Sequence, residues 1–203
     1  MKIAITGGIG SGKSFVCKRL EARGISVYDC DRAAKRLMRT DEKLKRKLQL
    51  LVGRDLYRDG QLQKPLMAKF LMKSEENMLA VNALVHPAVA NDFLQSGMTW
   101  LESAILFESG FYLMVPFSCV VCVVAPETVR LERIMQRDGI SREQAMQWIS
   151  KQWPQDKVMQ QSDFVIMNDG ESDVDQQLDQ MLETMAERHE FILNKDDINK
   201  INQ

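Results

Sequence analysis

A glycine-rich run near the amino terminus carries the pattern with the most specific chemistry. Residues 7–14 read Gly-Gly-Ile-Gly-Ser-Gly-Lys-Ser after a short apolar segment, and they fit G-x-x-x-x-G-K-[ST]. Glycines let the backbone curl so that successive N–H groups point at phosphate oxygens, and a helix behind the loop adds its positive end. Lys13 in this pattern reaches the β- and γ-phosphates, and the Ser14 hydroxyl is placed to bind Mg²⁺. We therefore expect ATP to be held by Gly8, Ile9, Gly10, Ser11, Gly12, Lys13, Ser14 and Phe15.

Two other nucleotide-binding patterns fit less well. A dinucleotide-binding turn needs G-x-G-x-x-G, and its third glycine position falls on Lys13. Residues 194–197 read Asn-Lys-Asp-Asp, which resembles the guanine-reading N-K-x-D of GTPases. They lie in a polar tail, however, and no D-x-x-G follows a predicted strand, so we interpret the match as chance.

Two carboxylates follow the second predicted strand. The carboxyl end of a parallel strand faces the same crevice as the phosphate loop. Asp29 and Asp31 are therefore expected at that crevice. A carboxylate there could orient or deprotonate an acceptor hydroxyl. Asp31 could equally cap the helix that follows, and spacing alone does not decide between the two roles.

Three arginines share one face of a predicted helix at i, i+3 and i+7; they are Arg130, Arg133 and Arg137. Arginines in a helical segment can neutralise charge on a transferring phosphoryl group. A solvated face paired with the acidic residues of the same helix explains the pattern as well. From the residues alone, the solvated face is the better interpretation; the acidic partners would be Glu127, Glu132 and Asp138.

The cysteines give little sign of a metal site. Cys119 and Cys122 form C-x-x-C inside an apolar run that predicts a buried strand, where side chains three apart face opposite sides. A zinc site needs two further ligands, and neither His86 nor His189 has a partner motif. We expect reduced thiols and no metal at this pair.

Composition excludes several classes of protein. The chain has 203 residues, 45% hydrophobic and 27% charged, with a net charge of −1, so no global basic field exists to hold nucleic acid. The apolar stretch Val115–Val124 is too short to span a bilayer, and the first residues lack a signal-peptide pattern. The expected compartment is the cytoplasm. Nothing in the sequence indicates the oligomeric state.

The periodicity predicts an α/β fold in which strands alternate with helices, and hence a parallel sheet covered by helices. Residues 40–93 are mostly helical in pattern, with a turn at Asp59-Gly60 and a helix start at Lys64-Pro65. The polar end Asn194–Gln203 is expected to fray. The predicted strands are Lys2–Thr6, Ile25–Tyr28, Trp100–Ser103, Phe117–Val124 and Phe164–Met167. The other predicted helices are 12–23, from Asp31 onward, 127–137, from Ser141 onward and 173–193.

Taken together, about residues 1–170 resemble the dephospho-coenzyme A kinases, a family of nucleoside-monophosphate-kinase-like enzymes. The loop is generic, whereas the Asp-x-Asp, His-Pro and Arg-Asp segments in this order are far more specific. The resemblance is carried by residues 5–14, 27–31, 84–87, 105–108, 126–138, Gln152 and 162–170.

The resemblance implies an activity and an organisation. The family transfers the γ-phosphate of ATP to the ribose 3′-hydroxyl of dephospho-coenzyme A, the last step of coenzyme A biosynthesis. It implies a three-layer P-loop kinase fold in one domain with a helical coenzyme-binding insertion and a lid. On this sequence the core falls at about 1–39, 94–137 and 161–193, the insertion at about 40–93 and the lid at about 138–160.

Individual roles also follow from the resemblance. Asp31 matches the acceptor-facing aspartate, and with Lys13 and Arg137, the arginine before the lid, it forms the expected catalytic set. His86 matches the His-Pro of the coenzyme-binding segment, although a capped core histidine is the alternative. Glu102, which ends a predicted strand, could hold Mg²⁺ through water.

This chain departs from the family pattern in three places. Phe15 stands where the family often has threonine, and Ala104-Ile105-Leu106 replaces a common Pro-Leu-Leu. The lid stretch Gln152–Gln161 lacks arginine and offers only Lys157 as a cation. The sequence therefore does not identify the lid side chain that would help to hold ATP. Two alternatives to the coenzyme kinase remain at this point. One is a related kinase acting on another nucleotide or nucleoside, and the other is a nucleotide-binding switch without transfer activity.

Overall fold

A parallel sheet forms the centre of the protein in the computed structural model, which describes residues 1–201, with side chains through Arg188. The sheet has five strands in the order β2-β5-β1-β6-β7, and every neighbouring pair is parallel. The α/β prediction is confirmed. The strands are β1 (Ile3–Thr6), β2 (Val27–Asp29), β5 (Trp100–Glu102), β6 (Cys119–Val124) and β7 (Phe164–Met167).

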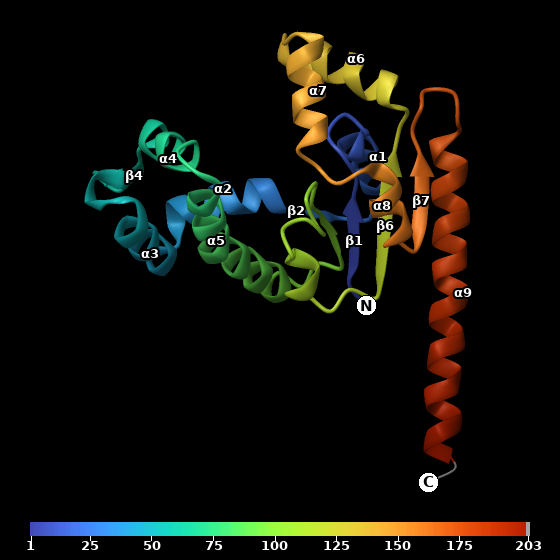
Figure 1. Ribbon diagram of the computed structural model, residues 1–203. Coiled ribbons are helices and arrows are strands. Elements are labelled where there is room, and N and C mark those ends of the chain that lie inside the picture. Colours follow the sequence, from blue (N-terminus) through green and yellow to red (C-terminus); the bar gives the residue numbers. More distant parts are fainter. Residues whose placement is uncertain (202–203) are drawn as a thin grey trace.

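Helices cover both faces of the sheet (Figure 1), which explains why its central strands are continuously apolar. One face packs against α1 (Lys13–Glu21) and α9 (Val174–Ile201). The other packs against α2 (Cys30–Thr40), α5 (Glu75–Gln95) and α8 (Gln155–Gln160). The cysteines of the C-x-x-C divide as expected for a strand: Cys119 lies in the first cluster and Cys122 in the second.

A helical lobe follows α2 and stands to one side of the sheet (Figure 1). The turn predicted at Asp59-Gly60 joins a short antiparallel strand pair, which the sequence analysis did not predict. The helix start predicted at Lys64-Pro65 is confirmed, with proline in the first turn of α4. The elements of this lobe are α3 (Glu42–Val52), η1 (Arg54–Leu56), β3 (Tyr57–Arg58), β4 (Gln61–Leu62) and α4 (Lys64–Leu71).

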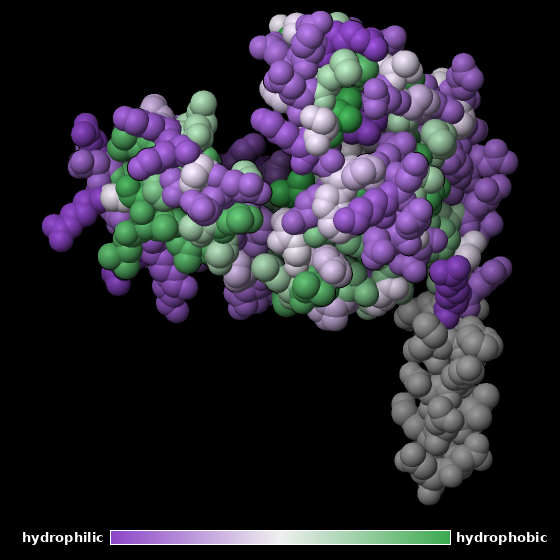
Figure 2. Space-filling model, viewed as in Figure 1, coloured by the Kyte–Doolittle hydropathy of each residue, from purple (hydrophilic) through white to green (hydrophobic). Residues whose placement is uncertain are grey.

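A second lobe, made by α6 (Glu127–Asp138) and α7 (Arg142–Ser150), stands over the carboxyl ends of the strands (Figure 1). α6 ends where Gly139 adopts a left-handed conformation, and Ser141 begins α7 through a capping box with Gln144. Figure 2 shows the surface hollowed between this lobe and that of α3–α5.

The carboxyl-terminal helix is longer than predicted. α9 continues to Ile201, through most of the segment expected to fray, and residues 202–203 lie outside the described part. The side chains of the N-K-x-D match at 194–197 also lie outside it.

Among the helices that the structure describes, none has both the length and the apolar character needed to cross a membrane. A short 3-10 turn, η2 (Phe111–Leu113), precedes β6.

Candidate active site

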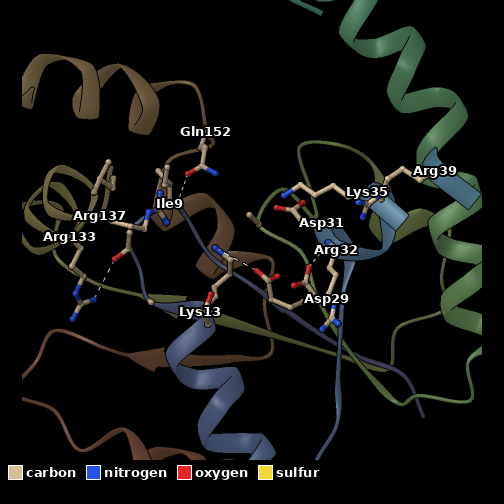
Figure 3. Close-up of a pocket in the computed structure, with 16 residues that line it drawn as sticks. Ile9, Lys13, Asp29, Asp31, Arg32, Lys35, Arg39, Arg133, Arg137 and Gln152 are labelled. Carbon is tan, nitrogen blue, oxygen red and sulfur yellow. Dashed lines mark hydrogen bonds and ion pairs between the residues drawn. The ribbon is translucent and has the colours of Figure 1, made fainter. Parts of the chain in front are cut away.

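The register of the sheet brings the phosphate loop and two carboxylates to one edge. Glu102, at the end of β5, pairs with Asp29 of β2 on one side and Ile5 of β1 on the other. β1 leads directly into the loop, so these groups meet at the carboxyl edge of the sheet. They line a cavity of about 720 Å³ that also receives side chains from α2, α6 and the segment after α7 (Figure 3).

Close neighbours require glycine at two positions of the loop. Gly12 has φ = 89°, and a Cβ placed there would collide with the side-chain Nδ2 of Asn168. Gly10 has φ = 78°, and its Cβ would lie 2.7 Å from the carbonyl oxygen of Arg130. Only glycine tolerates both the positive φ and the lack of room. The loop is therefore shaped by neighbours far along the chain as well as by its own sequence.

Two arginines of α6 brace the loop from behind. Arg130 is only 5% exposed, and its Nε donates to the carbonyl oxygen of Ile9 at 2.9 Å. Arg133 donates to the carbonyl oxygen of Asn168 at 2.9 Å, and Asn168 donates to that of Ser11 at 2.9 Å. The solvated face favoured from the residues alone is therefore wrong for Arg130, whose pKa is lowered by burial.

Arg137 fits both interpretations of the arginine face, the solvated ion pair and the phosphate-facing side chain. Its guanidinium is exposed and pairs with Asp138 at 2.7 Å, as the solvated interpretation anticipated. Yet Arg137 also lines the large cavity, together with Arg133 (Figure 3). A side chain held only by a surface ion pair is free to turn toward an incoming phosphate, because such pairs contribute little stability.

Lys13 lies deep in the cavity, between the loop and the carboxylates. Its Nζ donates to the carbonyl oxygen of Gly7 at 2.8 Å and lies 3.8 Å from a carboxylate oxygen of Glu102. Burial lowers the pKa of Lys13, and the negative charges of Glu102 and Asp31 oppose that shift. Burial likewise raises the pKa of Glu102, and Lys13 opposes it. Phosphate groups in the cavity would stabilise the charged lysine further.

The role of helix cap belongs to Asp29 rather than Asp31. Asp29 is the N-cap of α2, and its Oδ1 accepts a hydrogen bond from the Arg32 N–H at 2.8 Å. The cap interpretation of Asp31 is therefore wrong. Asp31 lies in the first turn of α2, exposed and facing the cavity near the loop, as Figure 3 shows.

His86 lines a second, more apolar cavity of about 360 Å³ between α2, α4 and α5. Its ring meets Phe111 edge-on, with centroids 6.0 Å apart, and burial lowers its pKa. Asp31 lines this cavity as well as the large one. The structure thus places His86 apart from the phosphate loop and joins the two regions at Asp31.

The remaining predicted loop residues differ in position. Ser14 lines the cavity, whereas Phe15 is 48% exposed, lies beneath the Arg19 guanidinium and does not line it. The Ser11 hydroxyl is buried and has no hydrogen-bond partner among the described residues. In the part of the chain that the structure describes, no three metal-ligating side chains of the His, Cys, Asp or Glu types gather at one point.

The segment after α7, expected from the sequence to belong to a lid, reaches the loop through Gln152. Its side-chain oxygen accepts a hydrogen bond from the Ile9 N–H at 2.6 Å (Figure 3). Lys157, the one cation noted there from the sequence, instead stacks over the Trp153 ring at 3.3 Å from the centroid. In this conformation, Gln152 and not Lys157 links the segment 152–161 to the site.

The sequence analysis missed a row of cations on α2 that lines the large cavity beside Asp31. Helical spacing shows that the three cations share one face, because their positions follow i, i+3 and i+7, but it does not show that this face borders a cavity. The row consists of Arg32, Lys35 and Arg39. The sequence analysis named Arg130, and Asn168 within 162–170, but it did not predict that they brace the loop, since nothing local to either residue indicates that role.

Comparison with known proteins identifies the family. The model of the dephospho-CoA kinase family matches residues 1–174. The chain belongs to the dephospho-CoA kinase family. A dephospho-CoA kinase of Bacteroides fragilis (strain YCH46) is 40% identical over 193 residues, which cover 92% of each chain. The chain is thus a kinase enzyme of this family, and membership implies the use of ATP.

Solved structures support the fold of the kinase. A protein from Thermus thermophilus superposes with a TM-score of 0.75 at 28% identity, covering 92% of this chain and 97% of that one. A dephospho-CoA kinase from Campylobacter jejuni superposes with a TM-score of 0.64 at 20% identity, covering 93% and 100%. At that identity the second match bears on the fold alone, a parallel sheet of the P-loop kinase type.

Proposed function

We propose that the kinase transfers the γ-phosphate of ATP to the ribose 3′-hydroxyl of dephospho-coenzyme A at the large cavity. The observation that carries this proposal is the position of Asp31, which lines both the cavity of the phosphate loop and the apolar cavity of His86. An acceptor in the second cavity would present its hydroxyl to Asp31 within reach of a nucleotide on the loop.

The test is ATP turnover with and without dephospho-coenzyme A, with the product identified by mass. We expect ADP release to require the acceptor and the product to gain one phosphoryl group at the 3′-oxygen. A panel of other nucleotides and nucleosides tests the related-kinase alternative. Equal or better turnover with another acceptor would overturn the substrate assignment, and ATP binding with no transfer to any acceptor would favour the switch.

The proposed chemistry uses few groups. Asp31 takes the proton of the 3′-hydroxyl as its oxygen attacks the γ-phosphorus, and the bond to the β-phosphate oxygen breaks to release ADP. Lys13 and Arg137 stabilise the charge that spreads over the transferring group. The buried bonds of Arg130 and Asn168 hold the loop in shape, so no energy is needed to organise it during the reaction.

The residues present fit a magnesium ion. Mg²⁺ is usually bound by one or two protein oxygens together with substrate phosphates rather than by a cage of side chains. Ser14 and Glu102 line the cavity and offer such oxygens. When bound, Mg²⁺ would neutralise phosphate charge.

Chelation tests this assignment. Excess chelator should suppress transfer because ATP oxygens and Ser14 then lack a bridging cation, and added Mg²⁺ should restore it. The readout is ADP formation. Full turnover in excess chelator would contradict a magnesium requirement.

We propose that the helical lobe of residues 40–93 takes the coenzyme and that residues 138–160 act as the lid. Support comes from the second cavity, which is walled mainly by α2, α4 and α5. For the lid, support comes from the bond between Gln152 and the loop amide of Ile9, because that N–H is then withheld from a nucleotide phosphate.

The contact between Gln152 and the Ile9 N–H predicts that Gln152→Glu weakens ATP binding. A carboxylate would accept the Ile9 N–H more strongly than an amide does and would repel phosphate, so ATP has to displace a stronger competitor. Hydrogen bonds to charged groups contribute about 1.5–3 kcal/mol, so we expect the Kd of ATP to rise at least about tenfold. Titration calorimetry measures it. Gln152→Leu, which leaves the amide free, is the matched control and should bind ATP no more weakly than the wild type. Equal affinities for Gln152→Glu and the wild type would contradict the contact.

A further inference from the structure

A row of cations on α2 has no assigned role in the site. Arg32, Lys35 and Arg39 line the large cavity at i, i+3 and i+7, so they share one side of the helix. Among the described residues, none of the three side chains forms an ion pair. By contrast, Arg36 on another side of α2 pairs with Asp92 of α5. Three cations exposed together repel one another, so their arrangement around a hollow indicates an anionic ligand.

The row is separate from the groups that serve the nucleotide. In Figure 3 the α2 cations lie around Asp31 on one side of Lys13, and Arg133 and Arg137 lie on the other. The loop amides and Lys13 are the groups that this kind of loop uses to hold nucleotide phosphates. The cavity therefore offers two anion-binding walls, one for ATP and one for a second charged molecule.

We propose that Arg32, Lys35 and Arg39 bind the diphosphate of the acceptor and thereby place its 3′-hydroxyl at Asp31. This inference rests on the proposed function, because dephospho-coenzyme A carries a 5′-diphosphate on the ribose that is phosphorylated. Arginine and lysine are the side chains that recognise phosphate oxygens, and arginine does so with paired donors.

The spacing along α2 suits this ligand. A helix rises about 1.5 Å per residue, so Lys35 lies about 6 Å beyond Asp31 along the axis and Arg39 about 12 Å. Only a few bonds of one ribose separate the 3′-hydroxyl of the acceptor from its 5′-diphosphate. That separation matches the rise of about 6 Å from Asp31 to Lys35 along the helix axis. Arg39 donates its Nε to the Lys35 carbonyl oxygen at 2.8 Å, which fixes the stem and leaves the terminal nitrogens for a ligand.

The test compares Michaelis constants for the two substrates in charge-removal variants of the full chain. Arg32→Gln, Lys35→Gln and Arg39→Gln, each alone, should raise the KM of dephospho-coenzyme A by about tenfold, because each removes one charge-assisted contact. The KM of ATP should stay within about twofold. Lys47→Gln, which removes an exposed cation of α3 outside both cavities, is the matched control and should change neither constant.

Two further measurements separate charge recognition from a structural effect. Lys35→Arg keeps the charge and should retain most of the affinity for the acceptor. In the wild type, the KM of dephospho-coenzyme A should rise with ionic strength, and a variant lacking all three cations should lose most of that dependence.

The outcomes distinguish this inference from the proposed function. An unchanged KM for dephospho-coenzyme A in all three single variants would overturn the inference while the proposed function stands. An equal rise in the KM of ATP would also overturn it, since the row would then serve the nucleotide. A wild-type protein that does not phosphorylate dephospho-coenzyme A would overturn both.

Discussion

Replacing Lys13 with methionine should lower turnover by at least about 10²-fold while the fold persists. The loss of one preorganised group that stabilises transition-state charge costs about 10²- to 10³-fold in rate, and Lys13 is a buried cation that bonds the loop backbone and lines the cavity. ADP release at saturating acceptor measures the loss, and calorimetry measures the accompanying decrease in ATP affinity.

The fold should survive Lys13→Met for a physical reason. Burial already lowers the pKa of Lys13, so its charge is costly to hold in the protein without ATP, and methionine fills a similar volume. Glu102 would lose its cation, but burial raises its pKa and allows it to take a proton instead. Lys18→Met on the exposed side of α1 is the matched control and should keep normal turnover. A folded Lys13→Met protein with near-normal turnover would contradict the assignment of the phosphate loop.

The phosphate loop could be predicted from the sequence because its shape and its ligands are local. Gly12, Lys13 and Ser14 follow one another, and a short strand before them and a short helix behind them complete the motif. What the sequence could not indicate is the support of the loop. Arg130 and Asn168 lie more than a hundred residues away, and they reach the glycines because β6 pairs with β1 and β7 pairs with β6.

The junction of β2 and α2 shows how a small shift in an element boundary changes a role. With a helix that begins just after Asp31, that residue would be its N-cap. The helix instead starts at Cys30, so the cap moves to Asp29 and Asp31 becomes free to face the cavity. Boundaries of this kind depend on strand pairing, here of Asp29 with Glu102, which periodicity does not contain.

The basic row and the small hairpin escaped prediction for opposite reasons. Arg32, Lys35 and Arg39 form a charged helix face, which in most proteins is simply solvated, and only the cavity beside them suggests a ligand. The hairpin of β3 and β4 has two residues in each strand, too few to give an alternating pattern. Its turn was still predicted, because Asp59-Gly60 favours positive φ at both residues.

Asp31→Asn should lower kcat by about 10²- to 10⁴-fold, the range typical for the loss of a general base. Asparagine keeps the size of aspartate and can still accept a hydrogen bond from the 3′-hydroxyl, but it cannot take the proton. ATP affinity should stay within a few fold, because the loop amides and Lys13 are unchanged. Single-turnover measurements with ATP and dephospho-coenzyme A report the chemical step directly.

The melting temperature separates this role from a structural one. Asp31 does not cap α2, and its carboxylate contributes only about 0.3–1 kcal/mol through the positive end of that helix, so Asp31→Asn should melt close to the wild type. Asp41→Asn is the matched control: Asp41 caps α3 through the N–H groups of Lys43 and Leu44, and asparagine caps about as well. It should change neither melting nor kcat. If Asp31→Asn retained its kcat, the hydroxyl would lose its proton to another group, and Asp31 would serve only the charge balance around Lys13.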